Sequence, residues 1–167
     1  MFYVIIILSN FVENQKRSIS VNLQVFAEKL SELLFDYKKV GRDVAKDISI
    51  GKTTIYEYLS GTKMPTLTNL IKLADYFNCS TDYLLGLEPE NYEFSFKTPK
   101  PFNVRFQEVL SHFKITRYKL EQLTGIAESA LYYWAKGKRI PTIEKILLVC
   151  KTLDCRVDFF IGRSDLA

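Results

Sequence analysis

The sequence of 167 residues has few of the side chains on which metal and redox sites depend. It contains three cysteines (Cys79, Cys150 and Cys155) and one histidine, His112. No two cysteines form a C-x-x-C pair, and a zinc site needs about four ligands at suitable spacings. An odd number of cysteines without a secretory signal is typical of a reducing cytosol. We therefore expect small thiols in the core, no metal site, no cofactor and a cytoplasmic location.

Long hydrophobic runs are also lacking. Residues 2–8 form one apolar run of seven residues, whereas a membrane-spanning helix needs about 20. A signal peptide would add a basic segment and a small-residue cleavage site, and neither is present. We expect no membrane association. Residues 1–20 are an apolar extension that forms a β-like segment packed on the body, forms a dimer contact, or results from a start codon placed too early.

The signatures of an active site are missing as well. His112 has no nucleophile paired with it in the sequence, and the carboxylates are spread as on a solvated helix face. Residues 49–54 superficially resemble a phosphate-binding loop, but that motif requires a glycine where Lys46 stands and a strand before it. We expect no catalytic residues, no nucleotide site and no small-molecule ligand.

The chain does have ample apolar material for a core and a mild excess of positive charge. Apolar residues make up 47% and aromatic residues 14%, and 23 Lys and Arg stand against 19 Asp and Glu. Residues 102–167 carry 11 basic and 7 acidic side chains, whereas residues 21–88 carry 8 and 9. This balance is compatible with a nucleic-acid partner but does not establish one.

The second half of the chain repeats the first. The Gly, Pro and Thr of residues 61–66 return 76 residues later, and so does the pattern of residues 78–86. Four residues of the segment 26–31 recur at a larger spacing, 80 residues later. This difference predicts that the first copy has four more residues than the second between this segment and the matches at a spacing of 76. Two copies of one domain are the simplest interpretation.

Each copy has the pattern of five short helices. Apolar residues recur at helical spacing in five segments per copy, and glycines and prolines fall between these segments. The segments are 23–34, 44–48, 55–59, 67–77 and 82–85 in the first copy, and 106–113, 120–123, 131–135, 143–153 and 158–161 in the second. We predict an all-α fold.

The predicted boundaries give two domains and a linker. We expect the N-terminal extension at 1–20, a first domain at 21–87, a linker with prolines at 88–101 and a second domain at 102–167. Tyr92, Phe94 and Phe96 alternate along the linker, as on one face of a strand. The linker therefore either docks onto a domain through these rings or is held loosely.

The centre of each copy is a short helix, a tight turn and a second helix. In the first copy these are residues 42–48, 49–51 and 52–60. Ile50 and, in the second copy, Ile126 place an apolar residue inside the turn, which holds the two helices at a fixed angle. A helix-turn-helix needs this rigidity, because its second helix protrudes into a major groove about 12 Å wide.

These residues resemble the Xre/Cro/cI family of phage-repressor-type DNA-binding domains. The matching residues of the first copy are Val44-Ala45, Ile50, Ile55, Gly61-Thr-Lys-Met-Pro65-Thr, Leu73-Ala74 and Asp82-Tyr-Leu-Leu. Those of the second are Leu120, Thr124-Gly125-Ile126 and Gly137-Lys-Arg-Ile-Pro141-Thr. The resemblance implies two tandem five-helix domains like that of lambda repressor, each with its third helix as the recognition helix.

The resemblance also implies which side chains face DNA. In the first copy they are Lys52, Thr53, Thr54, Tyr56, Glu57, Ser60 and Lys63, whereas Ile55 and Tyr58 point inward. In the second copy they are Ser129, Tyr132, Tyr133, Lys136, Lys138 and Arg139, with Glu128 and Ala130 on the same face. Many family members open the second helix with a phosphate-binding Gln. Here Gly41 and Arg117 stand there, and Arg117 retains the role by its charge.

We expect a sequence-specific regulator of transcription, a repressor, that inserts the third helix of one or both domains into the major groove of double-stranded DNA. The two readers need not share a two-fold axis, so the site is open to direct or irregular repeats. Half-sites on one face of the duplex would lie about 34 Å apart, or a multiple of this. A homodimer would bring four readers together.

The alternative is a protein-interaction or dimerisation module, because a fold does not determine a function. In that case the second domain or the N-terminal extension binds a partner, as an antitoxin does, and the first domain alone reads DNA. Ala130, Tyr132 and Tyr133 make the second recognition face more apolar, and Ala127 is a poor N-cap. The basic residues that follow favour DNA phosphates instead.

Overall fold

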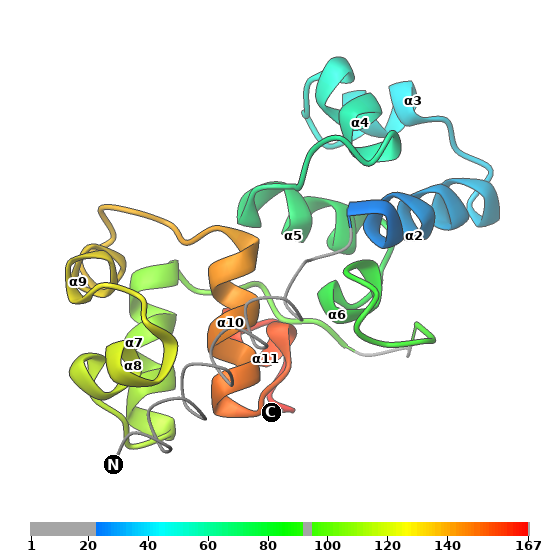
Figure 1. Ribbon diagram of the computed structural model, residues 1–167. Helices are drawn as coiled ribbons and strands as arrows, with labels where there is room; N and C mark the ends of the chain where they lie inside the picture. The colour runs from blue at the N-terminus through cyan, green and yellow to red at the C-terminus, as the bar shows by residue number, and fades with distance from the viewer. Residues whose placement is uncertain (1–22, 92–94, 167) are drawn as a thin grey trace, which may run out of the picture.

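The computed structural model describes residues 23–91 and 95–166. In these ranges the chain forms ten helices and no strand (Figure 1). The all-α class predicted from the sequence is therefore confirmed. Within the same ranges, no helix combines the length and the apolar character that crossing a bilayer requires. The expectations for residues 1–20, Tyr92 and Phe94 lie outside the described residues.

Five helices belong to each copy. In the first they are α2 (Leu23–Asp36), α3 (Gly41–Asp47), α4 (Lys52–Leu59), α5 (Leu67–Tyr76) and α6 (Thr81–Leu84). In the second they are α7 (Phe102–His112), α8 (Arg117–Thr124), α9 (Glu128–Ala135), α10 (Ile143–Leu153) and α11 (Val157–Ile161). Most ends lie within two residues of the predicted segments. The third helix of each copy, α4 or α9, is the one that the family resemblance implies as the recognition helix.

The first helices of the two copies correspond at a spacing of 76 residues, and the spacing of 80 inferred from the sequence is wrong. Lys38 and Lys114 follow these helices, and both have a φ of 51°. The next N–H groups, of Lys39 and Ile115, each donate to the carbonyl five residues earlier, at 2.8 and 3.0 Å. A shift of four residues is close to one helical turn, so it superimposes the same apolar face. Equivalent residues in the two copies therefore differ by 76 throughout.

A pair of aromatic rings lies at the centre of each copy. In the first copy Phe26 and Tyr58 pack edge to face at 5.8 Å, and both are buried. In the second copy the equivalent rings, Phe102 and Trp134, also pack edge to face at 6.3 Å, and Phe106 packs against Trp134 in the same way at 5.7 Å. Each pair joins the first helix of its copy to the recognition helix, so the position of the recognition helix is set by the core.

The three cysteines are free thiols, of which Cys79 and Cys150 are buried and Cys155 is half-buried. Burial raises the pKa of the Cys79 thiol to about 12. Cys79 is therefore protonated at neutral pH and unreactive as a nucleophile.

The linker docks onto the body through Phe96. Its ring lies 4.2 Å from the guanidinium carbon of Arg163, and the neighbouring N–H of Lys97 donates to the carbonyl of Arg163 at 2.9 Å. Of the two possibilities that the sequence left open, docking is therefore observed at this residue.

Candidate nucleic-acid interface

A turn with one buried isoleucine joins the two central helices in each copy. Ile50 is 8% exposed and Ile126 is 5% exposed, as the sequence predicted. The chain reverses at Ser49, with a φ of 54°, and at the equivalent Gly125, with a φ of 68°. Glycine adopts this left-handed conformation at little cost, whereas serine does not. The two copies thus share one turn geometry in spite of different residues.

The recognition helices α4 and α9 are held by the faces that point inward. Ile55 and Tyr58 are buried in the first copy, which confirms the predicted orientation of α4. The Tyr58 hydroxyl accepts a hydrogen bond from the side chain of Asn69 at 2.9 Å, which links α4 to α5. In α9 the equivalent buried residues are Leu131 and Trp134. The opposite faces of α4 and α9 remain accessible.

The predicted DNA-contacting residues of the first copy all keep some exposure to solvent. Lys52, Thr53, Tyr56, Ser60 and Lys63 are exposed, and Thr54 and Glu57 are half-buried.

Two contacts organise this face of α4. The Lys52 ammonium lies 6.0 Å from the centre of the Tyr56 ring. Near the end of the helix, Lys63 forms an ion pair with Glu57 at 2.8 Å, and the Ser60 hydroxyl donates to the carbonyl of Glu57. The charge of Lys63 is therefore partly balanced, and Lys52 provides the cation at the start of α4.

The predicted residues of the second copy gather around two tyrosines. Ser129, Tyr132, Lys136, Lys138 and Arg139 are exposed, and Arg117 and Tyr133 are half-buried.

Three cations lie against these tyrosine rings. Arg117 and Lys136 lie 5.6 and 5.9 Å from the centre of the Tyr132 ring, and Arg139 lies 5.1 Å from that of Tyr133. A cation over a ring keeps its charge, so these side chains stay available to an anion. The second face is thus aromatic and cationic together.

The start of α9 is capped by a residue that the sequence did not indicate. The Glu121 carboxylate of α8 accepts the N–H of Glu128 at 3.1 Å. The weak N-cap residue Ala127 is compensated in this way. The Glu128 carboxylate pairs with Arg117 at 3.4 Å, which partly neutralises it. No local pattern marks Glu121 as a cap, because it reaches α9 from the preceding helix.

The start of α4 differs from that of α9. Its N-cap residue is Gly51, which has no side chain to accept the first N–H groups. The residue equivalent to Glu121 is Ala45, which is buried. The first N–H groups and the positive end of the helix dipole favour an anion at such a terminus. A DNA phosphate is an anion of this kind.

The position equivalent to Arg117 is tightly packed in the first copy, where Gly41 stands. A Cβ atom on the equivalent Gly41 would lie 3.0 Å from Leu59 and 3.1 Å from Ile55. In the second copy Ala135 replaces Leu59, and this smaller residue leaves room for the arginine. The phosphate contact that the sequence assigns to Arg117 is therefore possible in the second copy alone.

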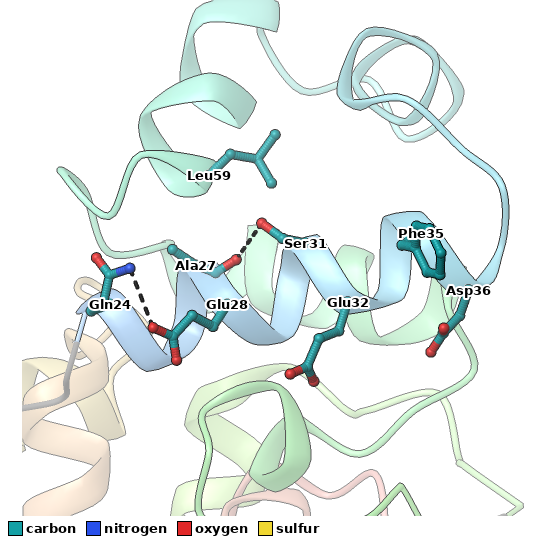
Figure 2. A pocket seen from close by; sticks show the side chains of 8 residues that line it. All are labelled: Gln24, Ala27, Glu28, Ser31, Glu32, Phe35, Asp36 and Leu59. Atoms are coloured by element: carbon teal, nitrogen blue, oxygen red, sulfur yellow. Dashed lines mark hydrogen bonds between the residues drawn. The ribbon is translucent and has the colours of Figure 1, made fainter.

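An acidic groove borders the recognition helix of the first copy (Figure 2). Glu28, Glu32 and Asp36 line it from α2, together with the exposed ring of Phe35, and Leu59 lines it from α4. Residues four apart lie on one side of a helix, so the three carboxylates form a row. Their charge disfavours a phosphate on this flank.

A groove beside the recognition helix of the second copy shares two positions with the acidic groove, those of Ser31 and Leu59, but carries positive charge. Arg117 and Lys136 line it together with Gln107 and Ala135. A duplex that lies against both recognition helices would therefore meet a repulsive flank in the first copy and an attractive flank in the second.

A family model described as "Helix-turn-helix" matches the chain twice, at residues 39–84 and 108–160, which together are more than half of its length. No match was found among curated proteins or among solved structures. The fold and the matches define a DNA-binding regulator of the helix-turn-helix class. The chain belongs to the Xre/Cro/cI-type family within this class, and it carries two tandem copies.

Proposed function

We propose that this protein is a sequence-specific repressor that binds double-stranded DNA by inserting α4 and α9 into the major groove. The observation that carries the proposal is present in both copies. A turn with a buried isoleucine holds a second helix whose outer face is accessible and polar or cationic. A repressor can act by occupying a promoter, and this requires only recognition helices that bind DNA. We therefore favour repression.

In the first copy, the start of α4 is assigned to the bases. Lys52, Thr53 and Tyr56 lie in its first two turns, and their ammonium and hydroxyl groups can bond base edges. Thr54 and Ser60 have hydroxyls that suit phosphates, and Lys63 suits them by its charge. Glu57 can accept a hydrogen bond from the amino group of cytosine if Lys63 moves to a phosphate. These roles are proposals for each residue.

In the second copy, the cations are assigned mainly to the phosphates. Arg117 lies at the start of α8, and Lys136, Lys138 and Arg139 follow the end of α9. Their contacts would supply affinity that falls as salt rises, because bound counterions are released from the DNA. Ser129, Tyr132 and Tyr133 lie between these cations and are assigned to base edges and thymine methyl groups.

Selection from a random duplex library at two salt concentrations tests the proposal. The native chain should enrich one sequence pattern. A variant with Lys52→Ala, Thr53→Ala and Tyr56→Ala should lose that pattern, by about 1–3 kcal/mol for each base contact removed, while its helical spectrum stays unchanged. Lys39→Ala, which removes one positive charge outside α4, serves as the control. Enrichment of the same pattern by the triple variant would contradict the role of α4.

A protein-binding role for the second copy is the other candidate. Tyr132 at 39% exposure and Ile140 at 59% give this region apolar surface that a partner could cover. Salt distinguishes the two roles, since contacts with phosphates weaken steeply as salt rises and apolar association does not. A homodimer of the chain stays a prediction, with sedimentation as its test.

A further inference from the structure

The two copies contact each other through equivalent helices that cap one another. The Asp82 carboxylate of α6 accepts the N–H of Val157 at 2.8 Å, at the start of α11. The Asp158 carboxylate of α11 accepts the N–H of Thr81 at 2.8 Å, at the start of α6. Asp82 and Asp158 are equivalent, and so are Thr81 and Val157. Such a reciprocal contact is what a two-fold axis produces between identical subunits.

Equivalent segments also face each other elsewhere in the molecule. Residues 64–68 of the first copy and 140–144 of the second line one groove between them. These segments lead into α5 and α10, whose N-terminal ends meet between α4 and α9 (Figure 1). The reciprocal capping contact and this shared groove are each formed by equivalent parts, so an approximate two-fold axis passes through both.

This axis determines how the recognition helices face DNA. A two-fold rotation does not change the position of a residue along the axis. Because the rotation relates α4 to α9, the two helices lie at the same height along the axis and on opposite sides of it. The segments that line the groove follow α4 and α9 closely in the chain, so both helices lie towards that end of the axis. B-DNA has two-fold axes of its own, and a duplex aligned with this one offers its major groove to both helices in the same way.

Arg163 holds the copies in this arrangement. It is fully buried, and its guanidinium bonds Asp158 at 2.6 Å, Asp75 at 2.8 Å and the carbonyl of Cys79 at 3.2 Å. Asp75 and Cys79 belong to the first copy, whereas Arg163 and Asp158 belong to the second. The equivalent of Arg163 is Leu87, which is exposed. One buried cation therefore joins the copies, and the linker alone does not determine their relative position.

The two recognition faces are related by the axis but differ in chemistry. Of the positions assigned to bases, those that differ are Lys52 and Glu128, Thr53 and Ser129, and Glu57 and Tyr133. The same bases therefore cannot suit both helices, since each base edge requires its own donors and acceptors.

We propose that a single chain of this protein binds an inverted repeat whose two half-sites are unequal, one read by α4 and the other by α9. This inference rests on the proposed function and adds the arrangement of the DNA site and its stoichiometry. It replaces the wider range of sites, direct repeats included, that the sequence left open.

Synthetic duplexes built from the site selected with the full chain test the arrangement. We compare the selected duplex with one in which a half-site is reversed in place, giving a direct repeat, and one in which a half-site is scrambled. Reversal and scrambling should each weaken binding about 100-fold or more, because every lost base contact costs about tenfold. Sedimentation of the complex should show one chain on each duplex.

A variant makes the test more specific. Glu128→Lys, Ser129→Thr, Ala130→Thr, Tyr133→Glu and Lys136→Ser give α9 the outward residues of α4. The site selected by this variant should become a palindrome of the half-site assigned to α4. Leu131 and Trp134 are kept, so the core is unchanged, and thermal unfolding checks that the variant is folded.

The outcomes separate this inference from the proposed function. A direct repeat, a single half-site bound as tightly as the pair, or two chains on each site would overturn the inference and leave a DNA-binding regulator. An unchanged half-site after the α9 exchange would overturn the assignment of α9. If the native chain enriches no sequence at all, the inference and the proposed function both fail.

Discussion

The two copies share one backbone plan and differ in the surfaces that surround their recognition helices. In the first copy α4 begins after a glycine and lies beside a row of carboxylates. In the second copy α9 begins at a capped terminus and lies beside Arg117 and Lys136. A few buried positions specify the helices and the turn, so charges on the outside are free to diverge. We therefore expect the first copy to contribute more to base recognition and the second more to affinity.

Two differences between the copies lie next to each other in space. Leu59 packs against Gly41 in the first copy, and Ala135 leaves space for Arg117 in the second. A side chain at the start of the second helix is therefore easier to place where the residue at the end of the recognition helix is small. A sequence read position by position does not reveal this dependence.

The largest effect on stability is expected for Arg163, which is buried between the copies, whereas its equivalent Leu87 is exposed. Arg163→Met should lower the free energy of unfolding by about 3–5 kcal/mol, because Asp158 and Asp75 lose their buried partner. Urea denaturation measures the change. Leu87→Met, at the equivalent exposed position, is the matched control and should change stability by less than about 0.5 kcal/mol. Equal effects at the two positions would show that Arg163 does not hold the copies together.

A second prediction uses the pair of carboxylates between the copies. Burial raises the pKa of Asp82 to about 6, and the nearby charge of Asp158 also raises it. The N–H groups of Asp158 and Val157 and the charge of Arg156 lower this pKa, but by less. The folded state therefore holds this proton at pH values where the unfolded chain has released it. The contribution of Asp82 to the free energy of unfolding should therefore fall by about 2–3 kcal/mol as pH rises from about 4 to about 6.

Urea denaturation at several pH values, compared between the native chain and Asp82→Asn, isolates this contribution. The variant cannot titrate at residue 82, so its stability should lack that decline, whatever its absolute stability. Parallel pH profiles for the two proteins would contradict the assignment.

A third prediction compares the charges beside the recognition helices. Lys136→Ala, Lys138→Ala and Arg139→Ala together should weaken DNA binding by similar factors on all sequences. They should also reduce the slope of log K against log salt by about 2.7, the value for three phosphate contacts. The opposite change, Glu28→Gln with Glu32→Gln in the first copy, should strengthen binding a few-fold at low salt. An unchanged slope in the triple variant would assign the second copy to a protein partner.

The smallest effect is expected at the turns. Ser49 adopts a left-handed conformation that Gly125 adopts more easily in the second copy. Ser49→Gly should raise the free energy of unfolding by about 0.5–1 kcal/mol, and Gly125→Ser should lower it by about 1–2 kcal/mol. Thermal unfolding measures both, and the same sign of change for the two substitutions would be inconsistent with the turn geometry.

Much of the fold and part of the candidate site could be predicted from the sequence. The spacing of apolar residues gave the helices and the inward positions of Ile55 and Tyr58, because burial of one helix face imposes that period. The same periodicity caused the error in the first helix. A shift of one turn preserves the apolar face, and only the turn at Lys38 and Lys114 distinguishes the two alignments.

The contacts between the copies could not be predicted in the same way. Asp82 and Asp158 recur in the repeat, and Leu87 is replaced by Arg163, so a signal was present. It did not indicate an interface, since a carboxylate at the start of a helix usually has a local role. Here each carboxylate caps the helix of the other copy, more than 70 residues away in the chain.

The sequence by itself determined two helical copies, their turns and the outward faces of their recognition helices, because these depend on residues within a few turns of one another. The tertiary structure alone decided how the copies face each other, which side chain caps α9 and where the acidic groove lies. These features depend on groups that meet only after the chain has packed, and burial without water makes their hydrogen bonds and ion pairs decisive.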